Sequence, residues 1–179
     1  MSNGRDLALI ERCRKGDRAA LDELVRAYEK PVFNAAYRIL GNPDDAADAT
    51  QTVFLKALEN LDRYDPKYKF FSWIYRIAVN ESINMGKRTS RQTPLDDYEP
   101  ASNESPVREA EADDLSREIQ MGLMKLNENY RTVVVLRHFT DCSYREISEI
   151  LEIPEKTVKS RLYSARQLMK DQLDAQGVL

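Results

Sequence analysis

The sequence predicts an all-α protein: two small helical domains joined by a flexible acidic linker, with a helix-turn-helix in the C-terminal domain. Apolar residues recur at helical spacing over most of the chain, and no stretch sustains the alternation typical of a strand. Glycine and proline number only six and seven in 179 residues, which favours long helices over turn-rich sheets. Large apolar residues become rare near Thr89, and this change of composition separates the two domains.

The composition indicates a soluble protein that can bury a core, with 42% hydrophobic residues, 32% charged residues and a formal net charge of −3. The charged N-terminus lacks the apolar run of a signal peptide or membrane span, so we expect a cytoplasmic protein without membrane insertion. Cys13 and Cys142 are expected to remain thiols in a reducing compartment. With the single histidine, His138, they show no metal-ligand spacing, so we expect no metal and no cofactor.

The first domain, residues 1–90, is expected to contain a long helix from about Asp44 to Asp62. One side of this helix is small and apolar, and the other is polar around Leu55. A single exposed leucine needs no explanation. A leucine among acidic and amide side chains also fits a docking surface for a protein partner, so both interpretations stay open. The polar side consists of Asp48, Gln51, Thr52, Leu55, Glu59 and Asp62.

A second unusual surface lies between Arg63 and Arg91, where seven cations accompany only two acids. Cations, aromatics and asparagines on one face suit unpaired nucleic acid, whose bases stack and offer their edges. For Trp73 and the neighbouring phenylalanines, a place in the core is the simpler interpretation. A helical projection puts five residues on the face: Trp73, Arg76, Asn80, Asn84 and Lys87.

The linker is expected to cover residues 91–113, which are rich in proline, serine and acids. Between Asp96 and Glu118 there are nine acids and two arginines. The net charge of the whole chain therefore says little about the two flanking domains.

The second domain, residues 114–179, ends in two predicted helices joined by a tight turn. Ser143 and Glu146 form a predicted capping box for the first helix, and Pro154 is suited to opening the second. Surface faces usually mix charge signs, but one arc of the second helix has cations and no acid, which favours insertion into the DNA major groove. This arc holds Lys156, Lys159, Ser160, Tyr163, Arg166, Gln167 and Lys170, opposite a stripe formed by Val158, Leu162, Ala165 and Met169.

With these residues in view, the chain resembles bacterial RNA polymerase sigma factors of the extracytoplasmic-function (ECF) type. The resemblance covers nearly the whole chain apart from the linker, and the order of the stretches is that of the family. Four stretches carry it: GDRAALDELVRAYEKPVFNAAYRILG, DAADATQTVFLKALENLDRYD, FFSWIYRIAVN and YRTVVVLRHFTDCSYREISEILEIPEKTVKSRLYSAR.

The resemblance implies a transcription initiation factor, not an enzyme, that binds core RNA polymerase and promoter DNA and helps melt the −10 region. It also allows an anti-sigma factor as a partner. Core polymerase would contact Asp48, Gln51, Leu55 and Glu59. The −10 element would contact Lys67, Tyr68, Arg76, Asn80, Asn84, Lys87 and Arg88, with Lys67 and Tyr68 lining a base pocket. The −35 element would contact Arg137, Tyr144, Lys156, Thr157, Lys159, Ser160, Arg161, Tyr163 and Arg166.

The sequence departs from the family pattern in the polymerase-binding helix, at Ala49, Thr52 and Leu58, and in the last helix, at Ser164. The departures in the first helix preserve its apolar and polar sides. Many family members carry arginine at the position of Ser164, so we expect the −35 preference to differ.

Two other functions compete with this one. A stand-alone helix-turn-helix regulator of duplex operator DNA explains the C-terminal domain but leaves the Asn80 face and the Leu55 surface without a purpose. An enzyme or a purely protein-binding adaptor is disfavoured, because we find no nucleophile–base pair, phosphate-cradling loop or metal cluster in the sequence. An adaptor would also not require an acid-free face on the last helix.

Overall fold

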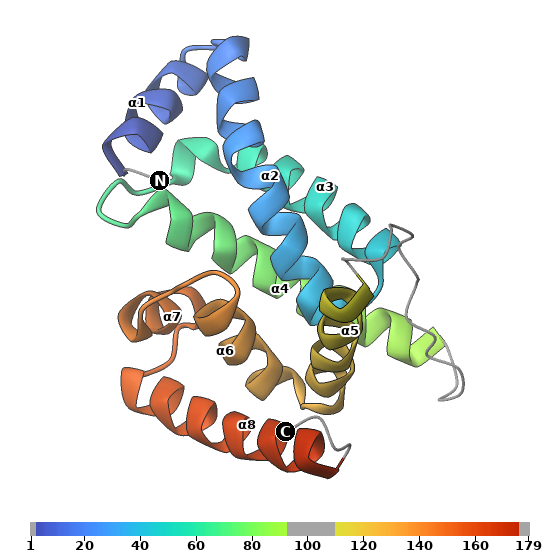
Figure 1. Cartoon of the computed structure of the whole chain (residues 1–179). Coiled ribbons are helices and arrows are strands. Elements are labelled where there is room, and N and C mark those ends of the chain that lie inside the picture. Colours follow the sequence, from blue (N-terminus) through green and yellow to red (C-terminus); the bar gives the residue numbers. More distant parts are fainter. Residues whose placement is uncertain (1–2, 93–109, 176–179) are drawn as a thin grey trace.

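The computed structural model describes residues 3–92 and 110–175, and its regular structure over these residues is entirely helical (Figure 1). The all-α prediction is therefore confirmed for the described part of the chain. The elements are α1 (Asn3–Arg14), α2 (Arg18–Leu40), α3 (Pro43–Glu59), a short 3-10 helix (Leu61–Arg63), α4 (Phe70–Gln92), α5 (Ala110–Lys125), α6 (Glu128–His138), α7 (Tyr144–Leu151) and α8 (Glu155–Ala175).

Local signals account for the helix ends of the first domain. Asp17 accepts a hydrogen bond from the amide of Ala20 and caps α2, which continues through Pro31. Gly41 ends α2 with φ of 78°, a left-handed conformation that glycine adopts without strain. Asn42 then caps α3 by accepting from two amides. The two long helices α2 and α3 are thus joined by only two residues.

The core of the first domain is built around aromatic rings at the start of α4. Phe70 makes edge-on contacts with Tyr28 of α2, at 5.2 Å between centroids, and with Tyr64, at 5.6 Å. Helix α1 is held by a buried hydrogen bond from the Tyr28 hydroxyl to the Asp6 carboxylate, 2.7 Å long. These contacts fix the start of α4 against α1 and α2, and so orient the rest of α4.

The second domain is a four-helix unit whose α7 and α8 form the predicted helix-turn-helix. The capping box is confirmed: the Ser143 hydroxyl accepts from the Glu146 amide, and the Glu146 carboxylate accepts from the Ser143 amide at 2.9 Å. Pro154 directly precedes α8, which begins at Glu155, so a proline at the opening of this helix is as expected. One boundary differs from expectation, because α5 already begins at Ala110, inside the predicted linker.

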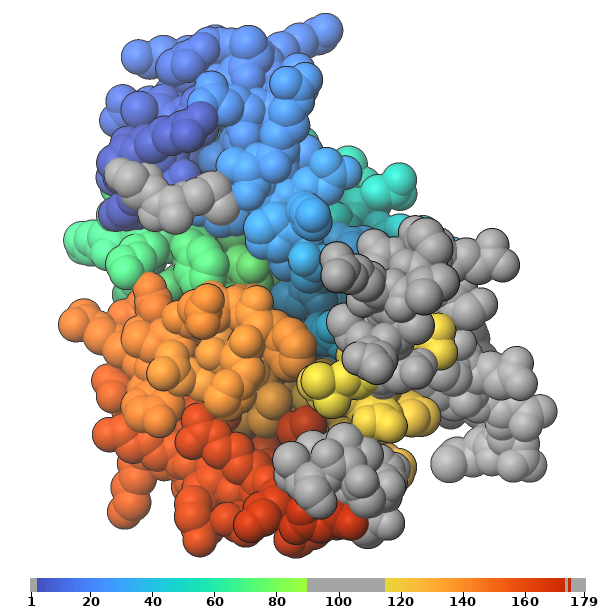
Figure 2. Space-filling model, in the orientation of Figure 1, coloured from blue at the N-terminus to red at the C-terminus, as the bar shows by residue number. Residues whose placement is uncertain are grey.

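The two domains pack directly against each other, with α4 on α7 and the end of α2 on α5 and α6 (Figures 1 and 2). Tyr75 of α4 and Cys142, just before α7, are both buried, and one apolar cluster runs through both domains. We call this contact the interdomain seam. Arg131 of α6 reinforces it by donating to the Ile39 carbonyl at the end of α2, 2.7 Å away.

We predict that the charge of Glu146 makes the folded state sensitive to acid. Burial alone would raise the pKa of Glu146, but hydrogen bonds from Lys69 and from Ser143 outweigh it, so the pKa lies below its ordinary value of 4.5. A lowered carboxyl pKa stabilises the fold above the unfolded-state pKa, and this contribution disappears as the pH falls through the folded-state pKa.

Glu146→Gln keeps a cap oxygen but cannot ionise, so it should lower the unfolding free energy at pH 7 by about 0.5–1 kcal/mol. The difference from wild type should vanish near pH 3 in urea titrations, which is well below the ordinary value of 4.5. A difference that is constant from pH 7 to about pH 3 would contradict the ionic account.

Candidate nucleic-acid and partner surfaces

The first surface lies on α3 and is the predicted protein-docking face. Asp48, Gln51, Leu55 and Glu59 are all exposed on it, as expected. Leu55 is 61% exposed, and Leu58 beside it is 38% exposed, so the surface is more apolar than the helical projection indicated. The surface is one face of a helix whose opposite side is buried through Ala46, Val53 and Ala57.

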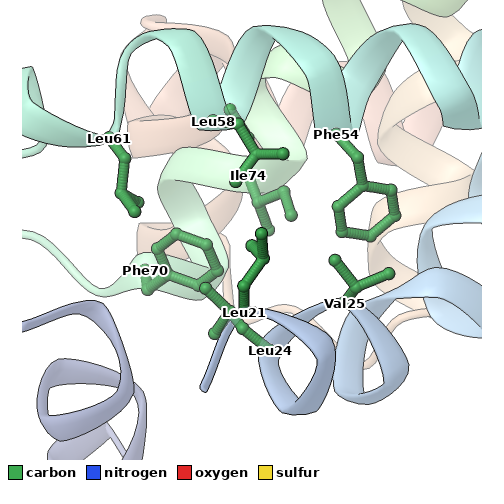
Figure 3. Close-up of a pocket in the computed structure, with 9 residues that line it drawn as sticks. Leu21, Leu24, Val25, Phe54, Leu58, Leu61, Phe70 and Ile74 are labelled. Atoms are coloured by element: carbon green, nitrogen blue, oxygen red, sulfur yellow. The ribbon is translucent and has the colours of Figure 1, made fainter. Parts of the chain in front are cut away.

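A hollow beneath Leu58 is part of the core packing and not a ligand site. Figure 3 shows side chains of α2, α3 and α4 converging on it, among them Leu21, Phe54 and Ile74. Its volume is only about 10 Å³, which holds at most one water molecule. Leu58 of the α3 surface therefore lies over tightly packed core side chains.

The second surface is an open pocket of about 380 Å³ between α3 and α4. Asn80 and Asn84 extend into it from α4, where both are exposed. Each amide offers an acceptor and two donors, which suits the edge of a nucleic-acid base. The full lining is Lys56, Asn60, Arg63, Trp73, Ile77, Asn80, Glu81 and Asn84.

Trp73 serves both the core and this pocket. Its ring packs 5.4 Å from Tyr64 and 5.5 Å from Phe70, between centroids, and it also lines the pocket. The expectation that Trp73 lies in the core is therefore correct for one side of its ring. An indole fixed by its neighbours is suited to stacking against an unpaired base.

The pocket has a different rim from the one that the sequence indicated. Lys67 and Tyr68 are exposed in the loop before α4 but are not among the residues that line the pocket. Lys56, Asn60 and Arg63 take their place from α3 and the 3-10 helix. In the sequence, Arg63 stood out only as one of the cations between Arg63 and Arg91, and Lys56 and Asn60 only as polar residues near the end of the expected helix.

Glu81 is the one acid among the pocket-lining residues, and it is 7% exposed. It forms an ion pair with Lys56 across the pocket wall, between α4 and α3. This pair neutralises the acid where a polyanion would approach, and it ties the two helices together.

Three cations in or just before α4 form ion pairs with acids of the second domain. Lys69 donates to Glu146 at 2.8 Å, Arg76 pairs with Glu152 at 2.9 Å, and Lys87 pairs with Glu128 at 3.1 Å. The Arg76 guanidinium also donates to the Glu149 carbonyl at 2.6 Å. Two of the predicted −10 residues, Arg76 and Lys87, therefore bind acids of the second domain. Arg88, the third predicted cation near this end of α4, is exposed.

The third surface is the predicted reading face of α8, and it points away from the seam. Val158, Leu162 and Ala165 are buried and Met169 is half-buried, so the opposite arc faces solvent as predicted. Thr157 and Arg161 are half-buried at its edge. The exposed residues are Lys156, Lys159, Ser160, Tyr163, Arg166, Gln167 and Lys170, and Tyr163 is 68% exposed.

Tyr144 connects α7 to this face. Its ring lies 5.5 Å from the guanidinium carbon of Arg137 and 5.7 Å from the ammonium nitrogen of Lys159. Arg137 is further held by a 2.9 Å bond to the Cys142 carbonyl. At the far end, Arg166 contacts His138, and burial together with Arg166 and Arg137 lowers the pKa of that histidine. A neutral His138 can then accept a hydrogen bond from Arg166.

In the part of the chain that the structure describes, no three or more His, Cys, Asp or Glu residues gather in a way that could hold a metal ion. Over the same residues, no helix combines the length and apolar character needed to cross a membrane.

Comparison with known proteins gives a consistent result. Residues 24–92 match sigma-70 region 2, and residues 116–169 match sigma-70 region 4. The ECF RNA polymerase sigma factor SigW of Bacillus subtilis (strain 168) is 35% identical over 177 residues, covering 92% of this chain and 94% of that protein. The ECF RNA polymerase sigma-E factor of Haemophilus influenzae is 31% identical, covering 94% and 95%.

Solved structures show the same fold. CnrH, in complex with the cytosolic domain of CnrY, superposes with a TM-score of 0.76 at 25% identity, covering 96% of this chain and 98% of that chain. The sigma factor RpoE of Bartonella quintana has a TM-score of 0.68 at 22% identity and covers 86% of this chain. Both comparisons cover most of this chain and support the helical arrangement described above.

The contrast between Glu81 and Asn80 gives a stability prediction for the pocket. Glu81→Gln should lower the unfolding free energy by about 1 kcal/mol, because it removes the ion pair with the half-exposed Lys56 and leaves a neutral amide at a buried position. Asn80→Ala, on the neighbouring exposed position, should change it by less than about 0.5 kcal/mol. Urea unfolding followed by circular dichroism measures both. Equal losses would mean that Asn80 supports the fold and is not free to contact a ligand.

Proposed function

The chain belongs to the sigma-70 family of RNA polymerase sigma factors, in its extracytoplasmic-function type, and on this basis we propose a separate binding function for each of its three surfaces. The protein is a transcription initiation factor that binds core RNA polymerase, directs it to specific promoters and helps to melt the −10 region. The observation that supports this proposal is that the two candidate nucleic-acid surfaces lie on different domains. The first domain has an asparagine-lined pocket, and the second domain has an acid-free helix face.

The exposed α3 surface is the proposed contact with core polymerase. Leu55 supplies apolar area, and Asp48, Gln51 and Glu59 surround it with groups that bond to a polar partner. The departures at Thr52 and Leu58 do not interrupt this surface, and the 38% exposure of Leu58 enlarges its apolar part.

The pocket between α3 and α4 is the proposed −10 site, where one base is captured out of the stack. Trp73 offers a ring for stacking, and Asn80 and Asn84 offer hydrogen bonds to the base edge. Arg63 and Lys56 at the rim attract the phosphate backbone. Lys67, Tyr68 and Arg88 are exposed but do not line the pocket, and we propose that they contact the strand outside it. Capture of an unpaired base favours the melted state over the duplex, because only the melted strand supplies it.

The α8 face is the proposed −35 reader. Lys159, Ser160 and Tyr163 lie at its exposed centre, where side chains reach base edges in the major groove. The surrounding cations neutralise phosphates, and Tyr144 and Arg137 extend this contact onto α7 and α6. The phosphate contacts of this face would be Arg137, Tyr144, Lys156, Thr157, Arg161 and Arg166.

We propose that the protein catalyses no reaction itself. The polymerase forms the phosphodiester bonds. We propose that the two functional domains end near residue 90 and begin near residue 114, and that the acidic linker joins them. CnrH was solved with the cytosolic domain of another protein, and this supports an anti-sigma factor as a further partner.

Reconstitution tests the function as a whole. Purified protein added to core polymerase on a promoter library should give initiation at a defined set of sequences, measured by sequencing the transcripts. A stand-alone operator-binding regulator should instead bind duplex specifically without polymerase. Folded protein that supports no specific initiation would refute the proposal.

Paired variants test the division of the surfaces. Asn80→Ala with Asn84→Ala should slow open-complex formation by about tenfold or more and leave core affinity unchanged, since base contacts contribute about 1–3 kcal/mol each. Leu55→Ala should weaken core binding by about tenfold, the effect of an interface anchor. Leu115→Ala, at an exposed leucine of α5, is the matched control and should do neither. Loss of core affinity in the asparagine variant would show that its face is misassigned.

A further inference from the structure

Arg14, at the end of α1, binds backbone carbonyls of a distant segment. Its Nη2 donates to the carbonyls of Leu61 and Tyr64, each at 2.8 Å, and to that of Asp62 at 3.4 Å. The Asp62 carboxylate is 4.0 Å away and 90% exposed, so its charge contributes little. A planar guanidinium presents several donors in a fixed arrangement and can hold these carbonyls together.

The other two arginines of α1 have different partners. Arg5 forms an ion pair with Glu23, and Arg12 forms one with Asp17 at 2.8 Å. Both pairs are exposed and join α1 to the nearby first turns of α2. Arg14 instead reaches 47 to 50 residues along the chain, to the segment between α3 and α4.

This segment carries part of the proposed −10 site. It contains the 3-10 helix Leu61–Arg63, whose last residue lines the pocket between α3 and α4. Tyr64 follows directly and is 3% exposed, and its ring lies 5.4 Å from that of Trp73, which also lines the pocket. The two closest carbonyls that Arg14 binds therefore lie on either side of Arg63 in the chain, and one belongs to the residue that supports the stacking ring.

The backbone here needs such an external contact. Residues 64–69 lie outside any helix, so repeating backbone hydrogen bonds do not hold them. A site that stacks a base and bonds to its edge requires its groups to be held to within about 0.5 Å. A buried side chain such as Tyr64 meets that requirement only if its own backbone is fixed.

We propose that Arg14 is a positioning residue of the −10 site. It does not touch the DNA, but it fixes the pocket rim and the residue against which Trp73 packs. The inference rests on the proposed function of the pocket. It adds a residue of α1, which precedes the residues 24–92 matched to sigma-70 region 2, to the groups on which promoter melting depends. Without the guanidinium, base capture weakens although every group that touches the base is unchanged.

The first experiment uses Trp73, the single tryptophan of the chain, as a reporter in the full-length free protein. Arg14→Met keeps most of the aliphatic stem and removes the donors. It should move tryptophan emission to longer wavelength and increase quenching by acrylamide, because the indole becomes more accessible to water. Far-UV circular dichroism should match wild type.

The control is Lys15→Met, which removes the same charge from the next residue, an exposed one. Its emission should match wild type. Unchanged emission in Arg14→Met, or an equal shift in Lys15→Met, would overturn the proposal. Arg14→Lys retains a single donor group and should give a smaller shift, and this variant decides the question if Arg14→Met loses helicity.

The second experiment measures base capture in the holoenzyme formed from the full chain and core polymerase. The probes are a fluorescein-labelled single strand with the −10 sequence that transcript sequencing identifies, and the same strand with an abasic residue at each position in turn. At the captured position, the abasic residue should raise the Kd of wild type about fivefold or more, the effect of losing one stacked base.

In Arg14→Met this abasic penalty should fall to about twofold or less, because a displaced ring stacks poorly on any base. Lys15→Met should keep the wild-type penalty. The penalty compares two strands on the same protein, so a smaller folded fraction cancels and a purely structural role of Arg14 leaves it unchanged. Direct binding of Arg14 to a phosphate would also leave it unchanged.

The outcomes separate this inference from the proposed function. If Arg14→Met keeps a penalty that wild type shows, the pocket captures a base without help from Arg14, and this inference alone is wrong. If wild-type holoenzyme initiates but shows no penalty at any position, the pocket does not capture a base, and both proposals are wrong. A lost penalty in Arg14→Met with partial recovery in Arg14→Lys supports the positioning role.

Discussion

The arrangement of the two domains depends on Arg131, whose guanidinium donates hydrogen bonds to backbone carbonyls at the ends of two helices. It donates to Leu123, Met124 and Leu126 at the end of α5, at 2.9–3.0 Å, and to Ile39 at the end of α2, at 2.7 Å. Helix C-termini leave carbonyls without partners and carry partial negative charge, so a cation is the group that satisfies them. This contact sets α6 against α2, and α7 and α8 follow from α6.

With α6 fixed, α7 packs on α4. Helix α4 therefore contacts different neighbours on its different sides. Its buried side packs Ile74, Ala78 and Val79 into the core of the first domain. The Asn80 side faces the pocket and α3, and the Arg76 side faces the acids of α7. A helix has enough directions for all three because successive side chains are turned by about 100°. The pocket and the interdomain seam are therefore adjacent, and domain packing bears directly on the nucleic-acid surface.

Local sequence signals predicted the helices well where caps and periodicity agree. The Ser143/Glu146 box, the buried stripe through Val158 and Leu162, and the exposed Leu55 all follow from spacing of three or four residues. Boundaries were less predictable. Helix α5 starts at Ala110 although the surrounding sequence is acidic, because charge alone does not break a helix once its later residues pack. Lys67 and Tyr68 were expected to line the pocket, but neither is among its lining residues, and the Tyr68 carbonyl instead accepts a hydrogen bond from the Tyr64 hydroxyl.

The sequence by itself determined the all-α class, the helix-turn-helix and the buried and exposed sides of α8, since all of these depend on residues close together in the chain. The order of four such stretches also indicated the family. Only the tertiary structure decided the partners of side chains far apart in sequence. Asn60 and Arg63 meet Asn80 across a pocket, and Arg76 meets Glu152, 76 residues further along. Helical periodicity gives the direction of a side chain from its own axis, but it does not give which helix lies opposite.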